Sequence, residues 1–416
     1  MSRSLCGACP VLEVLQWRQG NLWEPSRVYP EDLVNLQSGD LAPISKDTPV
    51  SVIIASANKI RDCPKCRKAL SEFFHMRDTW WSEHYKKSNG YFGCETTRDA
   101  GKVTGVNTWV YFEVKLLPKN IKEYYWNKLN VFTRWVEATN QTFILVFDPK
   151  PSIGDLVTDS LLGFDPALLS DPYWPYPTLF DIVANLQERA VWLIRDQVRG
   201  IEKDLPEPGT VPSPDYRNMH DIARHAIHVC ETLDVAVQTI ESVQMHYEKF
   251  LGSKPQQHDL ALDQDLRAQL EFYRGFIANL RHRSTSNEKR LQNEIQLAFN
   301  TVAQHNAGTS VEIGRAAQID SSAMKTIAFV TLIFLPPTFI SSIFSMSFFQ
   351  AGDGGGWGMS DNFWLYWVFA IPTTIATVLI WQYWHKFFPT ADCSKLSTGA
   401  NDPPAAVEMV EQKLPV

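Results

Sequence analysis

The chain has 416 residues, a formal net charge of −7 and 44% hydrophobic residues. This length fits one or two domains, and the mild acidity without a block of Lys and Arg excludes the usual basic nucleic-acid-binding protein. The first residues lack the long apolar run of a secretory signal, so we expect a cytosolic domain. The seven cysteines are then expected to be thiols rather than a disulfide framework.

Residues 1–150 are predicted to form an α/β domain with one central sheet. Short runs rich in β-branched and aromatic residues indicate strands. These runs are Val11–Trp17, Val50–Ala55, Thr108–Lys115 and Thr142–Phe147. Aromatic residues spaced three or four apart indicate helices. These helices are predicted over Ala69–Trp81 and Ile121–Val136.

Two Cys-x-x-Cys pairs lie in this first part, Cys6 with Cys9 and Cys63 with Cys66. Four thiolates are a ligand set for structural zinc. However, more than 50 residues separate the pairs, which is far beyond a compact zinc ribbon. The sequence alone therefore favours ordinary thiols over a zinc site or a redox centre.

Residues 151–256 are predicted to be helical. One helix is expected over Leu179–Ile201, and the next begins after Ser213 as N-cap with Pro214 in its first turn. Apolar residues then recur at spacings of three and four as far as Tyr247, which predicts packing against another long helix. Three histidines, His220, His225 and His228, lie on this helix. A metal site is conceivable there, but solvated histidines are the commoner case.

A very long helix is predicted to begin near Asp259, because no proline follows until Pro336. Continuous to about Met346, it would extend roughly 135 Å at about 1.5 Å per residue, too long for a globular core. Residues 257–325 are therefore predicted to form a stalk. Small and polar residues, among them Ser310, recur along it at intervals of four and seven. They indicate either a helix–helix contact or the wall of a water-filled passage.

Residues 326–386 are predicted to be a two-helix transmembrane domain. Thr326–Phe349 and Phe363–Trp384 contain no charged residue. About 20 apolar residues suffice to cross a bilayer. Aromatic residues at the ends of both segments fit the two membrane interfaces. Membrane lipid is therefore an expected partner.

The connecting loop carries Asp353 and Asp361 and no Lys or Arg, whereas lysines flank the hairpin on its other side. By the positive-inside rule both termini lie in the cytosol, and we expect the plasma membrane to be the location. Residues 387–416 are expected to be a disordered tail. No nucleophile–base motif or cofactor fingerprint is found, so neither an enzyme nor a bound cofactor is expected.

The segment MKTIAFVTLIFLPPTFISSIFSMSFF resembles the first membrane helix of the CorA family of divalent-cation channels. The shared residues are Met324, Lys325, Phe334, Pro336, Thr338, Phe339, Ile340, Ile343, Met346 and Phe348. The order of an α/β domain, a stalk helix, two spans and a short tail also resembles that family. The resemblance is specific over about residues 257–386. It implies a CorA-like fold, a homo-pentamer and a transported divalent cation such as Mg²⁺.

The family's Gly-Met-Asn signature stands here as Ser345-Met346-Ser347, a form that resembles fungal members of the superfamily. The resemblance puts Ser347 at the position of the Asn that holds a hydrated ion at the outer mouth. A serine hydroxyl is shorter and a weaker acceptor than an amide, so a wider and less selective ring is expected.

The resemblance also implies roles further along the first span. Hydrophobic pore constrictions fall at Met324, Ile327 and Leu335, and a polar pore ring falls at Thr338. Ser310 falls where the family has an acidic ring in the stalk. For each of these positions, lipid contact or helix packing is the alternative.

Two further points stay open. The acids Asp259, Asp263 and Asp265 are candidates for a regulatory cation site, although acids at a helix N-terminus are expected from its dipole alone. The substitutions at Ser310 and Ser347 also allow a second function. In that alternative the chain is a non-conducting membrane scaffold or sensor whose cytosolic domain binds a protein.

Overall fold

The structure is a computed structural model, which describes residues 10–18, 22–34, 48–82, 88–117, 123–161, 163–204, 210–253, 260–344, 349–351 and 357–387. The chain divides into two compact units, Met1–Gln304 and His305–Val416. Helix α7 (Leu260–Phe344) is continuous over 85 residues and contributes to both units. The predicted unbroken long helix is therefore confirmed.

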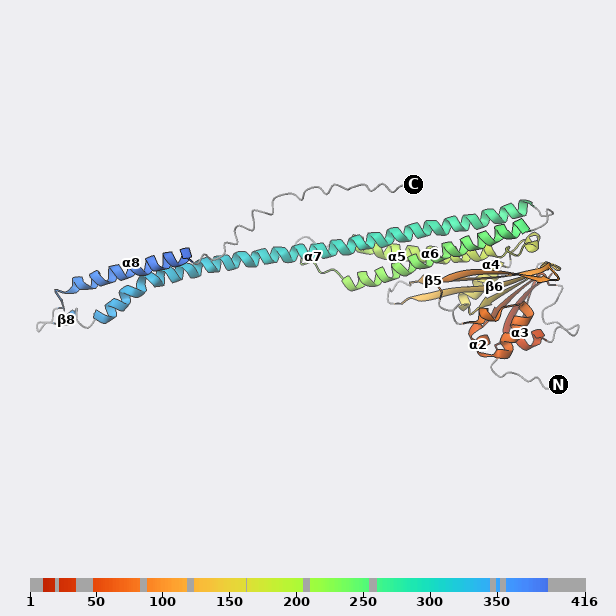
Figure 1. The fold of residues 1–416 in the computed structure, drawn as a ribbon, viewed down its shortest axis with the longest axis horizontal. Helices are drawn as coiled ribbons and strands as arrows, with labels where there is room; N and C mark the ends of the chain where they lie inside the picture. Colours follow the sequence, from red (N-terminus) through yellow and green to blue (C-terminus); the bar gives the residue numbers. More distant parts are fainter. Residues whose placement is uncertain are drawn as a thin grey trace. The chain divides into compact units, whose positions relative to one another are not determined.

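A seven-stranded sheet of order β2-β1-β3-β7-β6-β5-β4 is the centre of the first unit (Figure 1). The strands are β1 (Leu12–Arg18), β2 (Leu22–Val28), β3 (Val50–Ala55), β4 (Gly90–Asp99), β5 (Lys102–Leu116), β6 (Tyr125–Val136) and β7 (Gln141–Phe147). Only β3 and β7 pair in parallel, with Val50 opposite Thr142. All four strands predicted from the sequence are present, as β1, β3, β5 and β7.

Helices cover both faces of this sheet. They are α1 (Pro30–Val34), α2 (Ala57–Asp62), α3 (Pro64–Phe74), η2 (Asp78–Trp81), α4 (Pro151–Leu161), η4 (Pro166–Ser170), α5 (Tyr176–Lys203) and α6 (Tyr216–Ser253), with the start of α7. Successive side chains of a strand point to opposite faces of the sheet. Because helices cover both faces, every residue of β7 is buried. Ile144 and Val146 pack with α4, α5, α6 and α7, whereas Phe143 and Leu145 pack with α2 and α3.

Two predicted helices are wrong in part. The segment predicted as a helix over 121–136 contains strand β6, whose residues pair with β5 on one side and β7 on the other. Its side chains alternate between the faces, with Val131 in one core and Phe132 in the other. Helix α3 begins at Pro64 and ends at Phe74, because His75 takes a left-handed backbone conformation with φ of 52°. The predicted end at Trp81 falls in η2 instead.

The predicted helix over residues 179–201 is confirmed as α5. The following helix α6 begins at Tyr216, and the Asp215 carboxylate accepts the backbone N–H of Asn218 at 2.9 Å. Asp215, rather than the predicted Ser213, therefore accepts a free backbone N–H in the first turn of α6.

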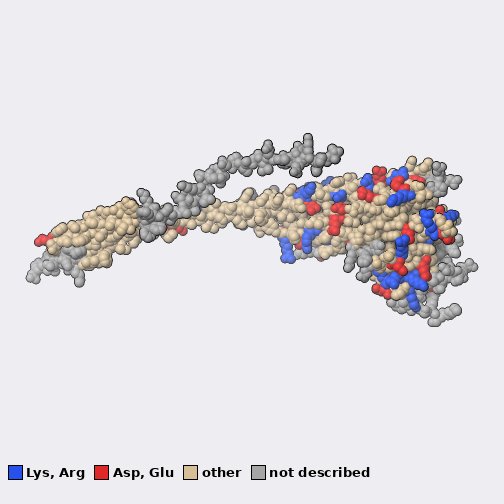
Figure 2. All heavy atoms as spheres, in the orientation of Figure 1, with Lys and Arg blue, Asp and Glu red and all other residues tan. Residues whose placement is uncertain are grey.

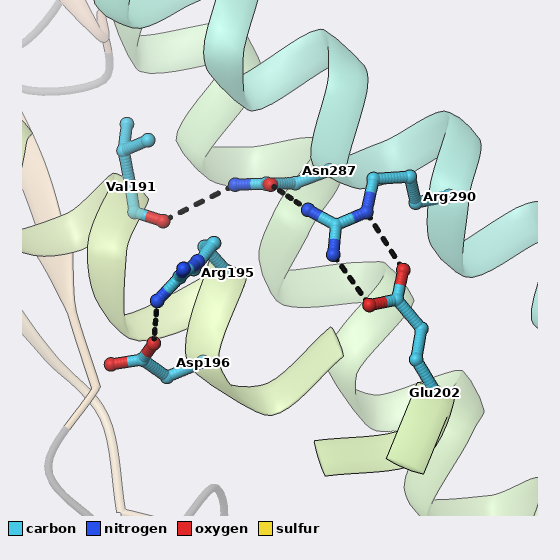
Figure 3. Close-up of polar contacts among 6 residues, drawn as sticks. All are labelled: Val191, Arg195, Asp196, Glu202, Asn287 and Arg290. Atoms are coloured by element: carbon cyan, nitrogen blue, oxygen red, sulfur yellow. Dashed lines mark hydrogen bonds and ion pairs between the residues drawn. The ribbon is translucent and has the colours of Figure 1, made fainter. Parts of the chain in front are cut away.

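Polar contacts fix the first-unit part of α7 to α5 (Figure 3). The Arg290 guanidinium donates to both Glu202 carboxylate oxygens, at 2.7 and 2.5 Å. The buried Asn287 donates its side-chain amide to the Val191 carbonyl at 3.3 Å. The hydrogen bond from Arg290 lowers the pKa of the Glu202 carboxyl. This bidentate pair holds the two helices in one register.

The second unit contains the rest of α7, the two short strands β8 (Phe349–Ala351) and β9 (Trp357–Met359), and helix α8 (Phe363–Phe387). The strands are antiparallel, with Phe349 opposite Met359. The predicted fold class, an α/β domain followed by a long helix and two apolar C-terminal helical segments, is confirmed.

Candidate functional site

The second unit holds two helical segments that are long and apolar enough to cross a membrane, at the end of α7 and over Phe363–Tyr383 of α8. In their most apolar windows only 11% and 6% of residues are buried. A core helix of a soluble protein would be mostly buried, and neither segment lies near the N-terminus. Figure 2 shows groups of Lys, Arg, Asp and Glu spread over the first unit, whereas the visible surface of these apolar segments is almost free of them.

Helix α8 packs on one face of α7. The rings of Phe329 and Trp381 lie 5.5 Å apart between centroids, and the Tyr366 hydroxyl donates to the Pro337 carbonyl at 3.4 Å. Ile340, one turn beyond Pro336, is buried at 8% exposure. These contacts define the α8-facing side of the first apolar segment.

The opposite side of α7 carries a continuous row of residues that we call the α7 stripe. Because an α-helix turns about 100° per residue, positions separated by three, four or seven share a face. The stripe consists of Ser310, Ala317, Asp320, Met324, Ile327, Thr331, Leu335, Thr338 and Ser342. Met324, Ile327 and Leu335 are 64%, 67% and 60% exposed in the single chain. The structure thus brings five sequence-predicted site residues, Ser310, Met324, Ile327, Leu335 and Thr338, onto one face.

The hydroxyl groups of the stripe are oriented by their own helix. The Thr338 hydroxyl donates to the Phe334 and Leu335 carbonyls, both at 2.9 Å, and Thr331 donates to the Ile327 carbonyl at 2.8 Å. A hydroxyl has one hydrogen to donate and two lone pairs that accept. With the hydrogen used inside the helix, each oxygen presents only lone pairs to its surroundings. Such oxygens favour a cation or the hydrogens of its hydration water.

Asp320 belongs to the stripe, and sequence analysis did not single it out. It lies four residues before Met324 and is exposed. The described part of α7 after Gln304 has four charged residues, and Asp320 is one of them. The other three, Glu312, Arg315 and Lys325, lie off the stripe. The four-residue spacing to Met324 was the signal that could have identified Asp320. It puts a carboxylate one turn before the predicted apolar constrictions.

The pair Pro336-Pro337 lies within α7. Proline has no backbone N–H, so the carbonyls of Leu332 and Ile333 lose their usual helical donors. Beside this point a hollow of about 360 Å³ is lined by Pro336, Phe339, Ile340, Ile343, Phe369 and Thr373. With only Thr373 polar, the hollow fits an acyl chain or a neighbouring helix, and it is no site for an ion.

The loop end of the hairpin is described only in part. Ser345, Met346, Ser347 and Asp353 lie outside the described residues, as does Asp259 at the start of the long helix. Asp361 is described and exposed, two residues before α8 begins. The exposed carboxylate is thus at the end of the loop that the sequence predicts to be extracellular.

Two of the three candidate histidines of α6, His225 and His228, take part in aromatic packing. The buried His225 ring lies 5.4 Å from the ring of Tyr124, and the His228 ring lies 5.8 Å from that of Trp126. The buried Lys115 amine sits over both aromatic rings, at 4.2 and 5.1 Å, and burial lowers its pKa. Among the described residues, no three His, Cys, Asp or Glu side chains gather as a metal site.

Comparison with known proteins gives distant similarities. No family model matches the chain. The notoamide biosynthesis cluster protein M' of Aspergillus versicolor is 31% identical over 292 residues, which are 64% of this chain. The match spans 61% of that relative's length.

Three solved structures are similar in fold, each at low identity. The CorA magnesium transporter from Methanocaldococcus jannaschii is 13% identical, with 90% of this chain and 98% of that chain covered and a TM-score of 0.41. The full-length CmaX protein is 15% identical, with 90% and 97% covered and a TM-score of 0.40. The ZntB cytoplasmic domain from Vibrio parahaemolyticus is 9% identical, with 72% and 98% covered and a TM-score of 0.41.

Proposed function

We propose that this protein is an oligomeric membrane channel for divalent metal cations, Mg²⁺ or a related ion, and that the membrane potential drives the flux. The observation that carries the proposal is the α7 stripe. It is a row of outward hydroxyl oxygens and apolar side chains, free of positive charge, on the side of a membrane-length helix that α8 leaves open. The proposal is one of transport and assigns no catalysed reaction and no cofactor.

An oligomer is required because a single hairpin cannot enclose a path for ions. Several copies of α7 with their stripes turned inward would do so, with α8 outside against the lipid. The sequence resemblance to the CorA family implies five copies. The proposed topology has two spans with both termini in the cytosol, in the plasma membrane.

The proposed path has two kinds of lining. Rings of Met324, Ile327 and Leu335 are narrow and apolar, and such constrictions gate by excluding water. A ring of Thr338 oxygens accepts hydrogens from the water around a hydrated ion. This suits Mg²⁺, which gives up its water reluctantly and is often recognised through it.

Acidic residues would attract cations at both ends. Asp353 and Asp361 lie in the predicted outer loop, and Asp320 lies on the cytosolic side of Met324. A divalent ion gains about 4.6 kcal/mol for each 100 mV of inside-negative potential. Passive entry therefore needs no other energy source. Ser347, in the Ser345-Met346-Ser347 tripeptide, would form the outer ring, where a hydroxyl selects less strictly than an amide.

The test is cation uptake by liposomes that contain the purified full-length protein. Mg²⁺, Co²⁺, Ni²⁺ and Zn²⁺ are offered in turn under an imposed inside-negative potential, and at least one is expected to enter. Thr338→Val is expected to reduce uptake by roughly two- to tenfold, the factor for one lost hydrogen bond of about 0.5–1.5 kcal/mol. Ser347→Asn is expected to increase the preference for Mg²⁺.

The matched control is Thr326→Val. Thr326 also donates its hydroxyl to the carbonyl four residues earlier, at 3.0 Å from Ser322, but it lies off the stripe. This variant should conduct like the parent protein. Absence of uptake of all four ions would overturn the channel proposal, and equal losses in both threonine variants would remove the stripe from the ion path.

A second candidate function is a non-conducting membrane scaffold or sensor with a protein-binding cytosolic domain. Two observations favour it: Ser310 stands where an acidic ring is expected, and the first unit has a cavity of about 560 Å³ between the end of α5, the start of α6 and α7. Apolar and acidic side chains, including Val211, Met219 and Glu294, line this cavity. Lack of uptake by well-folded protein in liposomes would favour this alternative.

A further inference from the structure

A small hollow lies at the end of helix α3, on the face of the sheet that α2 and α3 cover. The exposed residues His75, Arg77 and Thr79 and the buried residues Trp80 and Asn107 are part of its lining. Its volume is about 20 Å³. About 10–15 Å³ is enough for one water molecule, and a halide ion is only slightly larger. The hollow therefore accepts a single monatomic ion or water, and it is too small for a phosphate group.

One wall of the hollow contains an unused hydrogen-bond donor. Trp80 is 4% exposed, and its ring packs against Trp81 and Phe147, with centroids 4.7 and 4.5 Å away. The Trp80 indole N–H meets no acceptor in the part of the chain that the structure describes. A buried donor without a partner costs free energy, and this favours a small acceptor in the hollow.

A buried positive charge lies behind another wall. Arg134 is 7% exposed, and its guanidinium donates to the Asn107 Oδ1 at 3.0 Å. The Asn107 amide donates in turn to the Phe74 and His75 carbonyls at 3.3 and 2.9 Å, which fixes its oxygen toward Arg134. No carboxylate among the described residues pairs with Arg134. Burial lowers the pKa of Arg134 to about 10, so the guanidinium stays charged at neutral pH.

The neighbouring groups do not neutralise this guanidinium. Glu95 also lines the hollow, but its two carboxylate oxygens accept from Arg77 at 2.8 and 2.7 Å. Burial and the charge of Arg134 lower the pKa of His75, so its imidazole is neutral at pH 7. The C-terminal end of α3 supplies about half a negative charge. A buried charge without a counter-charge is costly, and an anion in the hollow supplies the missing charge.

We propose that the hollow binds one chloride ion, which accepts a hydrogen bond from the Trp80 indole N–H and neutralises the charge of Arg134. The small volume selects a monatomic ion over larger anions, and the uncompensated guanidinium selects an anion over a metal cation. The bound ion joins η2 and the end of α3 to strands β5 and β6. The residues of this site all belong to the first unit, so it is independent of the proposed cation path.

The test is chloride binding to the purified full-length protein in detergent, measured from the line width of the chloride NMR signal. Methanesulfonate keeps the ionic strength constant while chloride is added, and saturable broadening is expected. Trp80→Phe keeps an aromatic ring and removes the N–H, and Arg134→Met removes the charge. Each is expected to weaken binding roughly tenfold or more, the factor that one hydrogen bond or contact with a charged group supplies.

The matched control is Trp23→Phe. The Trp23 indole N–H is also buried without an acceptor among the described residues, but the ring packs with Phe164 on the other face of the sheet. This variant should bind chloride like the wild-type protein. Equal weakening in Trp23→Phe and Trp80→Phe would overturn the proposal, as would unchanged binding in both Trp80→Phe and Arg134→Met.

A second measurement needs no variant of the hollow's donors and covers the case in which those variants do not fold. In the wild-type protein chloride should raise the pKa of His75, because a neighbouring anion stabilises the imidazolium. NMR titration of the histidine side chains measures this, with the His75 signal assigned from its absence in His75→Asn. A His75 pKa that is the same in chloride and in methanesulfonate would overturn the proposal and would leave the hollow to water.

Discussion

The two stretches of helix α7 have similar apolar residues in opposite environments. In the first unit Leu270 and Ile277 are fully buried against the helices that cover the sheet. In the second unit Ile319 and Ile327 are 70% and 67% exposed. Apolar residues alone therefore do not decide burial within a chain. The first stretch packs against its own chain, whereas the second exposes an apolar surface among the described residues, and large surfaces of this kind mark membrane or protein contacts.

The two stretches of α7 also differ in how many charged residues they carry. In the first unit, ion pairs such as Arg290–Glu202 join α7 to its neighbours, and charged residues of both signs are spread over the surface (Figure 2). Past Gln304 the charges thin out, and Asp320 is the one that remains on the described stripe. The segment from Thr326 to the end of α7 has no charged residue at all, which is the composition of a membrane-spanning helix.

The largest expected difference comes from the same substitution made in each region. Ile277→Ala should lower the unfolding free energy of the first unit by about 2–5 kcal/mol, because it leaves a cavity in a packed core. Ile327→Ala should change it by less than about 0.5 kcal/mol, since this side chain is exposed in the single chain. Denaturant titration of the detergent-solubilised protein, followed by near-ultraviolet circular dichroism, measures both. Similar losses in the two variants would contradict the proposed difference.

A smaller effect is expected at Asp320. Asp320→Asn should weaken the apparent affinity for the transported cation by roughly fivefold, the factor that corresponds to about 1 kcal/mol of lost attraction. The effect should shrink at high ionic strength, where exposed charges are screened. Uptake measured against cation concentration gives the affinity.

Glu312→Gln is the control for that measurement, because Glu312 is an acid of the same helix that lies off the stripe. It should leave the affinity unchanged. Equal weakening by both substitutions would mean that the overall charge of the helix matters and the stripe does not.

The smallest effect is expected at the contact between α5 and α7. Glu202→Gln should destabilise the first unit by about 0.5–1 kcal/mol at neutral pH, since the pair is partly exposed and screened by solvent. The pKa of Glu202 is lowered in the folded protein. The stability that its ion pair with Arg290 contributes is therefore complete at pH values above the ordinary pKa of 4.5. It disappears as the pH falls from there through the lower folded value.

Unfolding measured at pH 7 and at successively lower pH values below 4.5 tests this sign. The wild-type protein and Glu202→Gln should become equally stable in acid. Glu271→Gln, an exposed acid elsewhere on α7, should show no such convergence. A difference between wild type and Glu202→Gln that grows in acid would contradict the assignment.

Much of the fold follows from local pattern, and the exceptions have identifiable causes. The continuous apolar runs of β3 and β7 identify buried strands directly. Strand β4 escapes such analysis because Gly93 weakens its pattern, yet only glycine fits there: an added Cβ would lie 2.2 Å from the Trp109 ring. In β6, aromatic residues spaced three or four apart resemble a helix, and only the pairing with β5 and β7 makes this segment a strand.

The candidate site was predictable in part for a similar reason. Helical spacing by itself places Met324, Leu335 and Thr338 on one side of α7. Which side α8 covers depends on contacts such as Phe329 with Trp381, and no local rule supplies these. Asp320 shares this spacing, but its charge sets it apart from the small and polar residues whose pattern predicts the stripe.

The central claim is that the α7 stripe, and not the α8-facing side, lines an aqueous path. Single cysteines introduced at Met324, Ile327, Leu335 and Thr338 test it, with Phe329 and Ile340 as the α8-facing controls. The protein is kept in membranes and treated with a charged, water-soluble thiol reagent. We predict modification with a period of three to four residues, confined to the stripe and accompanied by loss of cation uptake. Equal modification of both sides, or modification of the Phe329 and Ile340 variants alone, would contradict the claim.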